Sequence, residues 1–247
     1  MPPSTNQHSV SHRAGGGLRP RADAREVLLR GGESPLLSRP LTHPTRATCR
    51  SLMAPDLIPQ TVMPITAPEL ETQRLRIRAV AESDLQDLMS VNGDQEVTKY
   101  LPYGTWTTSE DATSWLGRMQ ALQASGSGVQ LVIQEKSSNS CIGTVLLFKL
   151  DEVSSRVELG YVLARRSWGQ GLMKEGLSAV LDHCFESAGL RRIEAEVNPE
   201  NISSNKLLSA LGFTLEGCAR KRWVAKGVAY DTNLYGLLAP EWRTSAA

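Results

Sequence analysis

The sequence predicts one folded domain of the α/β class, in which helices flank a mixed, mostly antiparallel sheet. Two observations lead to this prediction. Three strand-like segments, at residues 129–134, 141–150 and 155–164, follow one another across short polar turns, which is typical of an antiparallel meander. The third segment continues into a glycine-containing turn and an amphipathic stretch, which indicates a strand, a turn and a helix.

Elements before the meander are predicted from periodicity and helix-end signals. Residues 74–79 alternate as a strand, and Ser83 can cap a helix that runs through Val91. A second helix is expected to begin at residues 108–110 and to reach about residue 124. Two helices therefore follow the first strand.

Elements after the meander begin with the helix that follows the glycine turn. Its apolar positions recur every four residues up to Cys184, and Gly189 suits a helix stop. A strand at 191–197, a helix at 201–211 and a hairpin follow, the hairpin strands being 213–224 and 229–238 around a turn near Gly227. The predicted order is βααβββαβαββ.

An N-terminal extension precedes the domain. The first 52 residues contain no Phe, Trp, Tyr or Lys, and carry eight Arg against three acidic residues. Such a segment buries too little apolar surface to offset its chain entropy, so we expect residues 1–62 to be disordered and 63–247 to form the domain. A basic arm, an organelle transit segment and a misplaced start, with Met53 or Met63 as the true start, are alternative origins of the extension.

The composition of residues 53–247 excludes several classes of protein. This part has 19 basic and 23 acidic residues, so nothing indicates a nucleic-acid partner. There is no apolar run near 20 residues, so no membrane span is expected, and we expect a cytoplasmic protein. Four widely spaced cysteines and few histidines predict neither a metal site nor a disulfide framework, and His183 is expected to be an ordinary, partly buried side chain.

The glycine turn at residues 165–173 carries most of the functional information. Gly169 and Gly171 allow the backbone close to a bulky anion, and the N–H groups that open the helix then point at its charge. A dinucleotide fingerprint would need a third glycine where Lys174 stands, and a P-loop would need a lysine where Leu177 stands. A nucleotide or coenzyme diphosphate is the expected ligand, and a purely structural corner is the alternative.

Three motifs together resemble one family. Arg166 to Gly171 matches R/Q-x-x-G-x-G/A, the acetyl-CoA pyrophosphate loop of the GNAT superfamily of N-acetyltransferases. Residues 70–78, followed by Asp84, resemble the opening of its RimJ/RimL branch, the ribosomal-protein N-terminal acetyltransferases. Residues 198–213 are similar to that branch's N-x-x-N-x-x-S segment and its later L-G-F. The resemblance covers about residues 68–240.

The resemblance implies a single GNAT acyltransferase fold whose central strands splay apart to admit acetyl-CoA, with no metal. It implies backbone contacts to the coenzyme near residues 161–163, and further contacts from the pyrophosphate loop and from two asparagines. The implied coenzyme-binding residues are Tyr161, Val162, Leu163, Arg166, Ser167, Trp168, Gly169, Gln170, Gly171, Leu172, Met173, Asn201 and Asn205. For Asn205, a role as a helix cap is the alternative.

The expected general base is Glu158, on the strand that leads into the loop. A protonated amine has no lone pair, so a base must remove a proton before the neutral amine attacks a thioester. A carboxylate among apolar neighbours can have a raised pKa that suits this role. A solvated strand residue or an ion-pair partner is the alternative reading of Glu158. Glu194 and Glu196 share one face of the next strand and are further candidates.

The expected general acid is Ser204. Many GNAT enzymes carry a tyrosine four residues before the glycine of the G-F pair, but this chain has Leu208 there. In the ribosomal branch, a serine at the head of the helix is thought to serve, and Ser204 occupies the matching place. A helix-start residue that satisfies backbone N–H groups is the alternative.

Acceptor contacts are predicted from two segments. Tyr100, Tyr103 and Trp106 lie between the first two helices, where they either grip a peptide or pack on the body of the domain. A basic hairpin at 217–231, with four Lys and Arg at 220, 221, 222 and 226, either attracts an acidic acceptor protein or is a solvated surface.

The resemblance thus implies an acetyl-CoA-dependent transfer to the N-terminal α-amine of a protein. Its similarity to the RimJ/RimL branch implies that this acceptor is a ribosomal protein. One alternative is acetylation of a small amine, such as an aminoglycoside, a polyamine or an amino-acid derivative. Another is a coenzyme-binding module without turnover, which the missing tyrosine keeps open. Family members often form homodimers, and no feature of this sequence decides that point.

Overall fold

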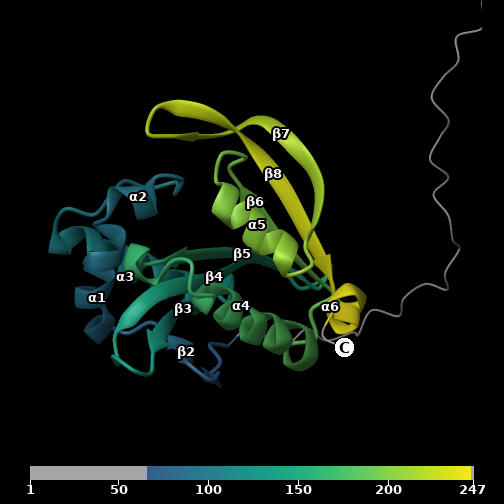
Figure 1. Cartoon of the computed structure of the whole chain (residues 1–247), viewed down its shortest axis with the longest axis horizontal. Helices are drawn as coiled ribbons and strands as arrows, with labels where there is room; N and C mark the ends of the chain where they lie inside the picture. Colours follow the sequence, from purple (N-terminus) through teal and green to yellow (C-terminus); the bar gives the residue numbers. More distant parts are fainter. Residues whose placement is uncertain (1–65, 246–247) are drawn as a thin grey trace, which may run out of the picture. The chain divides into compact units, whose positions relative to one another are not determined.

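The computed structural model describes residues 66–245, whose centre is an eight-stranded sheet in the order β1-β2-β3-β4-β5-β6-β8-β7 (Figure 1). The predicted extension at 1–62, with Cys49 and Met53, lies outside these residues, and so does Met63. All neighbouring strands are antiparallel except β5 and β6, which are parallel. The predicted mixed, mostly antiparallel sheet is confirmed.

The first part of the domain contains two short strands and three helices. These are β1 (Leu70–Glu71), β2 (Leu75–Ala79), α1 (Leu85–Asn92), α2 (Gln95–Thr98) and α3 (Ser109–Ala124). The helix predicted to begin at Ser83 begins later, after a 3-10 turn at Glu82–Asp84. Asp84, rather than Ser83, organises this start, because its carboxylate accepts hydrogen bonds from the Ala81 N–H and from both terminal nitrogens of Arg78, each at 2.8 Å.

The predicted antiparallel meander is formed by β3 (Gly128–Glu135), β4 (Cys141–Asp151) and β5 (Arg156–Leu163). Strand β3 is buried along nearly its whole length, including the polar residues Gln130 and Gln134, whose amides donate hydrogen bonds to backbone carbonyls. Near the end of β4, the register between β4 and β5 shifts between Phe148 and Asp151, and Lys149 there has a positive φ of 55°. This bulge re-aims one side chain of the strand.

The glycine turn leads into α4 (Leu172–Asp182), which ends in a π turn at His183–Ser187. The apolar positions predicted every four residues are all buried, which confirms the periodicity. At Gly176, a Cβ atom would lie 3.4 Å from the Cδ1 atoms of Ile133 and Leu75, so the glycine lets α4 approach the sheet closely. Gly189 has a φ of 69° where the chain leaves the helix.

The last part of the domain contains β6 (Arg192–Val197), α5 (Ile202–Ala210), β7 (Thr214–Ala225), β8 (Val228–Leu238) and α6 (Ala239–Ser245). Strands β7 and β8 form the long predicted hairpin (Figure 1). The sequence prediction did not include α6. Trp242 anchors this helix, because its ring is buried in the main core and its Nε1 donates to Asp182 Oδ1 at 2.8 Å.

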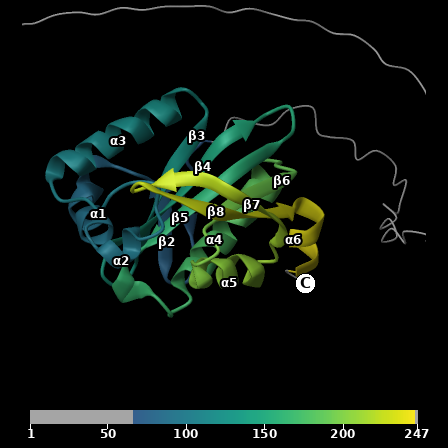
Figure 2. The same ribbon diagram turned by 90° about the horizontal axis from the view of Figure 1, so that it is seen from above.

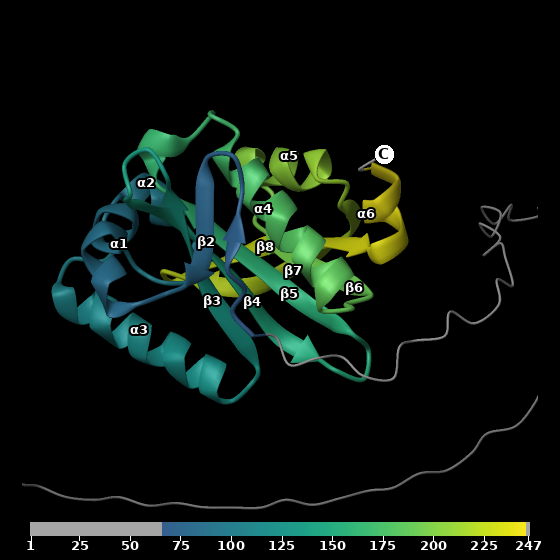
Figure 3. The ribbon, with the colours of Figure 1, turned by 90° about the horizontal axis from the view of Figure 1, so that it is seen from below.

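Two separate cores lie on opposite faces of the sheet, since alternate residues of β3 contribute to each. The main core packs α4, α5 and α6 against one face, and the second core packs α1 and α3 against the other. Figures 2 and 3 show these two sets of helices apart from each other. Below, the faces are called the α4 face and the α3 face.

The sheet is split at its centre. Strands β5 and β6 are paired only where residues 156–158 face residues 192–194. Beyond that point β5 continues beside β4, with Tyr161 opposite Val145, while β6 continues beside β8, with Glu196 opposite Leu234. The predicted splay of the central strands is confirmed.

Candidate active site

The glycine loop connects the open end of β5 to α4. After a 3-10 turn at Arg165–Ser167, Gly169 and Gly171 have φ values of 73° and 74°, which favour glycine. Two side chains of the loop bond back to the main chain: Trp168 Nε1 donates to the Leu163 carbonyl, and Gln170 Nε2 donates to the Arg166 carbonyl, both at 2.8 Å. The loop is therefore ordered by its own side chains.

This loop fits a diphosphate. The N–H groups of the first turn of α4 have no partner within the helix, and they carry the positive end of the helix dipole. Both glycines are exposed, and a Cβ at Gly169 would meet no atom within 4 Å, so an anion can approach there. Ser167, Leu172 and Met173 are buried, which leaves only their backbone groups for the predicted coenzyme contacts.

Glu158 lies at the point where β5 and β6 separate. It is opposite Glu194, the last pair of the parallel register, and its side chain is only 10% exposed. Burial raises the pKa of Glu158, although the Lys149 ammonium at 2.7 Å counteracts this effect. Because Val157 and Leu159 belong to the main core, Glu158 points to the α3 face.

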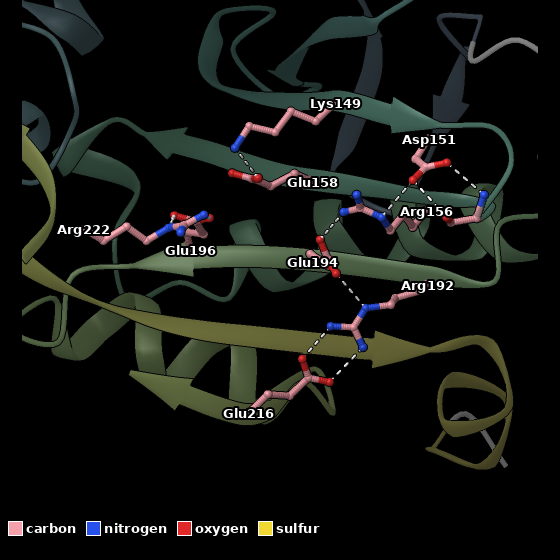
Figure 4. A network of polar contacts seen from close by, with 10 residues as sticks. Lys149, Asp151, Arg156, Glu158, Arg192, Glu194, Glu196, Glu216 and Arg222 are labelled. Carbon is pink, nitrogen blue, oxygen red and sulfur yellow. Dashed lines mark hydrogen bonds and ion pairs between the residues drawn. The ribbon is translucent and has the colours of Figure 1, made fainter. Parts of the chain in front are cut away.

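Sequence reasoning missed Lys149, the ion-pair partner of Glu158 (Figure 4). The simple alternation of side chains along β4 does not predict that this lysine lies beside Glu158. The bulge at Lys149 turns its side chain toward Glu158. The base candidate is thus a buried carboxylate with one half-exposed cation beside it.

The two other carboxylate candidates are held in ion pairs on the same face (Figure 4). Glu194 accepts from Arg156 and from Arg192, both at 2.8 Å. Glu196 accepts from Arg222 at 2.6 and 2.8 Å and from Trp223 Nε1 at 2.6 Å. Burial alone would raise the pKa of Glu196, but these hydrogen bonds outweigh it and hold the pKa below its usual range. Between Glu158 and Glu196, the raised pKa of Glu158 is the one suited to a base.

Ser204 lies on the opposite side of the split, in the first turn of α5. Its Oγ is 2.5 Å from the hydroxyl of Tyr161, which projects from the separated part of β5 to the α4 face. Burial raises the pKa of Tyr161 to about 12, although the hydrogen bond with Ser204 opposes the shift. The Tyr161 hydroxyl therefore stays protonated at neutral pH. The side-chain role of Tyr161 was not anticipated, although Val157, Leu159 and Tyr161 share one face by the period of two.

The alternative reading of Ser204 as a helix cap is not what the structure shows. Asn201 is the N-cap of α5, and its Oδ1 accepts from the Ser204 N–H at 3.2 Å. The Ser204 hydroxyl is therefore available to Tyr161. Asn201, predicted as a coenzyme contact, uses its side-chain amide oxygen for this cap.

Asn205 is committed to protein contacts. Its Oδ1 accepts from Asn233 Nδ2 and from the Tyr235 hydroxyl, both at 2.8 Å. Its Nδ2 donates to the carbonyls of Asn201 at 2.7 Å and Asn198 at 3.1 Å. These contacts use the whole capacity of the amide, so its predicted side-chain contact with coenzyme is replaced by a role in holding α5 against β8.

The three aromatic residues predicted to grip an acceptor differ in their surroundings. Trp106 is 6% exposed and packs in the second core, 5.4 Å from the ring of Trp115, so it is a packing residue, and its predicted acceptor contact is wrong. Tyr103 donates to Asn92 Oδ1 at 2.9 Å, and Tyr100 donates to the Glu200 carbonyl at 3.2 Å. Tyr100 and Tyr103 are half-buried and stay acceptor-contact candidates.

Two of the four basic side chains of the hairpin are neutralised by carboxylates. Arg222 bonds to Glu196, Lys221 lies 3.8 Å from Asp231, and Lys226 Nζ donates to the Thr98 carbonyl at 2.8 Å. Within residues 66–245, Arg220 forms no ion pair. The hydrogen bond from Lys226 to Thr98 also connects the tip of the hairpin to the end of α2.

No group of three or more His, Cys, Asp or Glu side chains within the described range is placed to hold a metal ion. Cys141, Cys184 and Cys218 are free thiols, and His183 is half-buried in the π turn, with its pKa lowered by burial. The helices between residues 66 and 245 include none long and apolar enough to span a membrane.

A split sheet, an anion-binding loop at the open end of β5 and a buried carboxylate beside the split define an enzyme that transfers an acyl group from a coenzyme thioester. The match to the model of the acetyltransferase (GNAT) domain covers residues 74–214. The chain belongs to this family and is an acetyl-CoA-dependent N-acetyltransferase.

Relatives and solved structures agree with this assignment. The uncharacterized N-acetyltransferase p20 of Bacillus licheniformis is 35% identical over 173 residues, which is 70% of this chain and 97% of that protein. The ribosomal-protein-serine acetyltransferase of Escherichia coli (strain K12) is 25% identical over 168 residues, 66% of this chain and 92% of that protein. The spermidine N-acetyltransferase of Vibrio cholerae, solved in complex with CoA and spermine, shares the fold, with a TM-score of 0.61 and 20% identity over 70% of this chain and 99% of its own.

Proposed function

We propose that the protein transfers the acetyl group of acetyl-CoA to the N-terminal α-amine of a protein, of the kind that RimJ/RimL-type enzymes acetylate in ribosomal proteins. The observation that carries this proposal is the placement of two kinds of group on opposite faces of the split. Glu158 lies on the α3 face, and the Ser204 and Tyr161 hydroxyls lie on the α4 face.

This placement suits the chemistry of a thioester. The amine approaches from the α3 face, where Glu158 accepts its proton, and the new N–C bond forms as the C–S bond breaks. The sulfur departs on the α4 face, where the Ser204 hydroxyl donates a hydrogen bond to the developing thiolate. Either hydroxyl can donate in the hydrogen bond between Tyr161 and Ser204. In the proposed step Tyr161 donates to Ser204 Oγ, so the pair takes the place of the tyrosine that this chain lacks at Leu208.

Backbone groups at the split supply the remaining need. In the separated part of β5, alternate N–H and C=O groups face away from β4 and have no β6 partner beside them. Such N–H groups suit the acetyl carbonyl oxygen, where negative charge develops during attack. Residues 161–163 are our proposed contacts for this oxygen and for the adjoining pantetheine.

The charges on the α3 face favour a single amine over a polycation. A polyamine or an aminoglycoside needs unpaired carboxylates, but Glu158, Glu194 and Glu196 each have a cationic partner. The similarity to a ribosomal-protein-serine acetyltransferase supports a protein acceptor, although that relative is only 25% identical. Tyr100 and Tyr103 are proposed to contact the first residues of the acceptor.

The test follows thiol release by the full chain with acetyl-CoA, using panels of N-terminal peptides, polyamines and aminoglycosides. Mass spectrometry then locates the added acetyl group. Acetylation of peptide α-amines is the expected result. Acetylation of small amines alone would overturn the choice of acceptor, and CoA binding without transfer to any amine in the panels would favour the module without turnover.

A further inference from the structure

A carboxylate in the first turn of α4 connects the coenzyme loop to the start of β2. Glu175 Oε1 accepts from Thr72 Oγ1 at 2.5 Å and from the Arg74 N–H at 2.9 Å. Glu175 Oε2 accepts from Arg74 Nε at 2.6 Å. These residues are about 100 positions apart in the sequence, so the contacts cross-link two distant segments of the domain.

The guanidinium of Arg74 bonds to both sides of Gly171. Its NH1 donates to the Gln170 carbonyl at 3.0 Å, just before the glycine, and its Nε bonds to Glu175, one turn after it. A Cβ at Gly171 would lie 3.7 Å from Arg74 NH2, so this part of the side chain is directly beside the loop. Arg74 is 45% exposed, and Glu175 is 20% exposed.

Two physical needs of the loop are met by this arrangement. Glycines lose more conformational freedom on ordering than other residues, so a loop with two of them binds an anion better when it is already fixed. A carboxylate in the first turn of α4 would also repel a phosphate bound there, and the paired guanidinium neutralises it.

We propose that Arg74 is a positioning residue for the coenzyme diphosphate, which it serves by fixing the glycine loop and by neutralising Glu175, with Thr72 as the second support. Arg74 acts through the loop, and its effect is specific to ligands that carry the diphosphate. The inference rests on the proposed use of acetyl-CoA but not on the identity of the acceptor.

The test compares two ligands that differ in the diphosphate. Binding of CoA to the full chain is measured by calorimetry, and binding of pantetheine, which lacks the diphosphate and the nucleotide, by ligand-observed NMR. Since hydrogen bonds to charged groups are at stake, we expect Arg74→Ala to weaken CoA binding roughly 10- to 100-fold. Pantetheine binding should change by less than about twofold, because its contacts lie away from the loop.

Two further variants sharpen the comparison. Arg76→Ala is the matched control, because Arg76 lies only two residues further along, in β2, is similarly exposed and pairs with Glu71 instead of the loop. This variant should bind both ligands normally. Arg74→Ala with Glu175→Gln should recover part of the lost CoA affinity, because it removes the unpaired carboxylate. Arg74→Lys should bind CoA with intermediate affinity, since a lysine cannot bridge both sides of Gly171.

An equal loss of CoA and pantetheine binding in Arg74→Ala, or no loss of either, would overturn the proposal. If Arg74→Ala fails to fold, Thr72→Val and Arg74→Lys supply the same comparison, with thermal melting as the check on folding. Failure of the proposed function is distinguishable from failure of this proposal. In that case the unmodified chain binds CoA without acetylating peptide α-amines, and the comparison of the Arg74 variants by CoA binding is unaffected.

Discussion

The hydrogen bond between Ser204 and Tyr161 allows a quantitative test of the proposed acid. Replacing Ser204 by alanine removes the donor to the departing thiolate, and a hydrogen bond to a charged group contributes about 1.5–3 kcal/mol. Because about 1.4 kcal/mol corresponds to a tenfold change in rate, Ser204→Ala should lower kcat roughly 10- to 150-fold. Tyr161→Phe removes a neutral hydrogen bond of about 0.5–1.5 kcal/mol and should lower kcat roughly 2- to 13-fold.

The double variant decides whether the two hydroxyls act together. The Tyr161 hydroxyl lies 2.5 Å from Ser204 Oγ, and in the proposed relay it acts on the sulfur through Ser204. Tyr161→Phe should therefore have almost no further effect in the Ser204→Ala background. The assay is single-turnover thiol release at saturating acetyl-CoA, with the Kd for CoA as a control expected to stay within about twofold. Losses that multiply in the double variant would refute the relay, and a raised Kd with unchanged kcat would refute the acid role.

Three further predictions concern Glu158, its ion-pair partner Lys149, and Asn205, which holds α5 against β8. Glu158→Gln should lower kcat about 10²- to 10⁴-fold with the CoA Kd unchanged, which stopped-flow thiol release and calorimetry together measure. Glu158 accepts a proton only when it is ionised, so activity should fall as the pH drops through its raised pKa. Lys149→Met removes the cation that lowers this pKa. The acidic limb of kcat/KM in a pH–rate profile should therefore move to higher pH. An unmoved limb would mean that another group titrates there. Asn205→Leu leaves the Asn233 and Tyr235 donors unpaired, which should lower the free energy of unfolding by about 2–4 kcal/mol in urea titrations. A loss below about 0.5 kcal/mol would contradict the role of Asn205 in holding α5 against β8.

The sequence predicts local features of this domain well and side-chain pairings poorly. Glycine spacing and apolar periodicity are local, so the loop at Gly169 and Gly171 and the buried face of α4 are both confirmed. The partner of Glu158 depends on a bulge at Lys149, where a residue other than glycine has a positive φ. Nothing in the local pattern indicates such a bulge, because the register of β4 against β5 produces it.

Pairings across long separations and very short elements escape prediction for related reasons. Glu196 finds Arg222 across 26 positions, through the order of β6, β8 and β7 in the sheet. The burial of Trp106 depends on Trp115 in α3, which the composition of its loop does not indicate. Strand β1 has two residues and α6 has seven, which is too short for periodicity to be recognised.

Strands β5 and β6 are paired at only three positions, so few backbone hydrogen bonds join the two halves of the sheet. Strands β1–β5 form one continuous half of the sheet and β6–β8 the other, and the short parallel register is the seam between them. A ligand lying in the split, whose amide groups can hydrogen-bond to both strands, closes this seam as a missing strand would. If acetyl-CoA binds in the split as proposed, the coenzyme is a part of the architecture as well as a reactant, and each turnover removes and replaces a piece of the sheet.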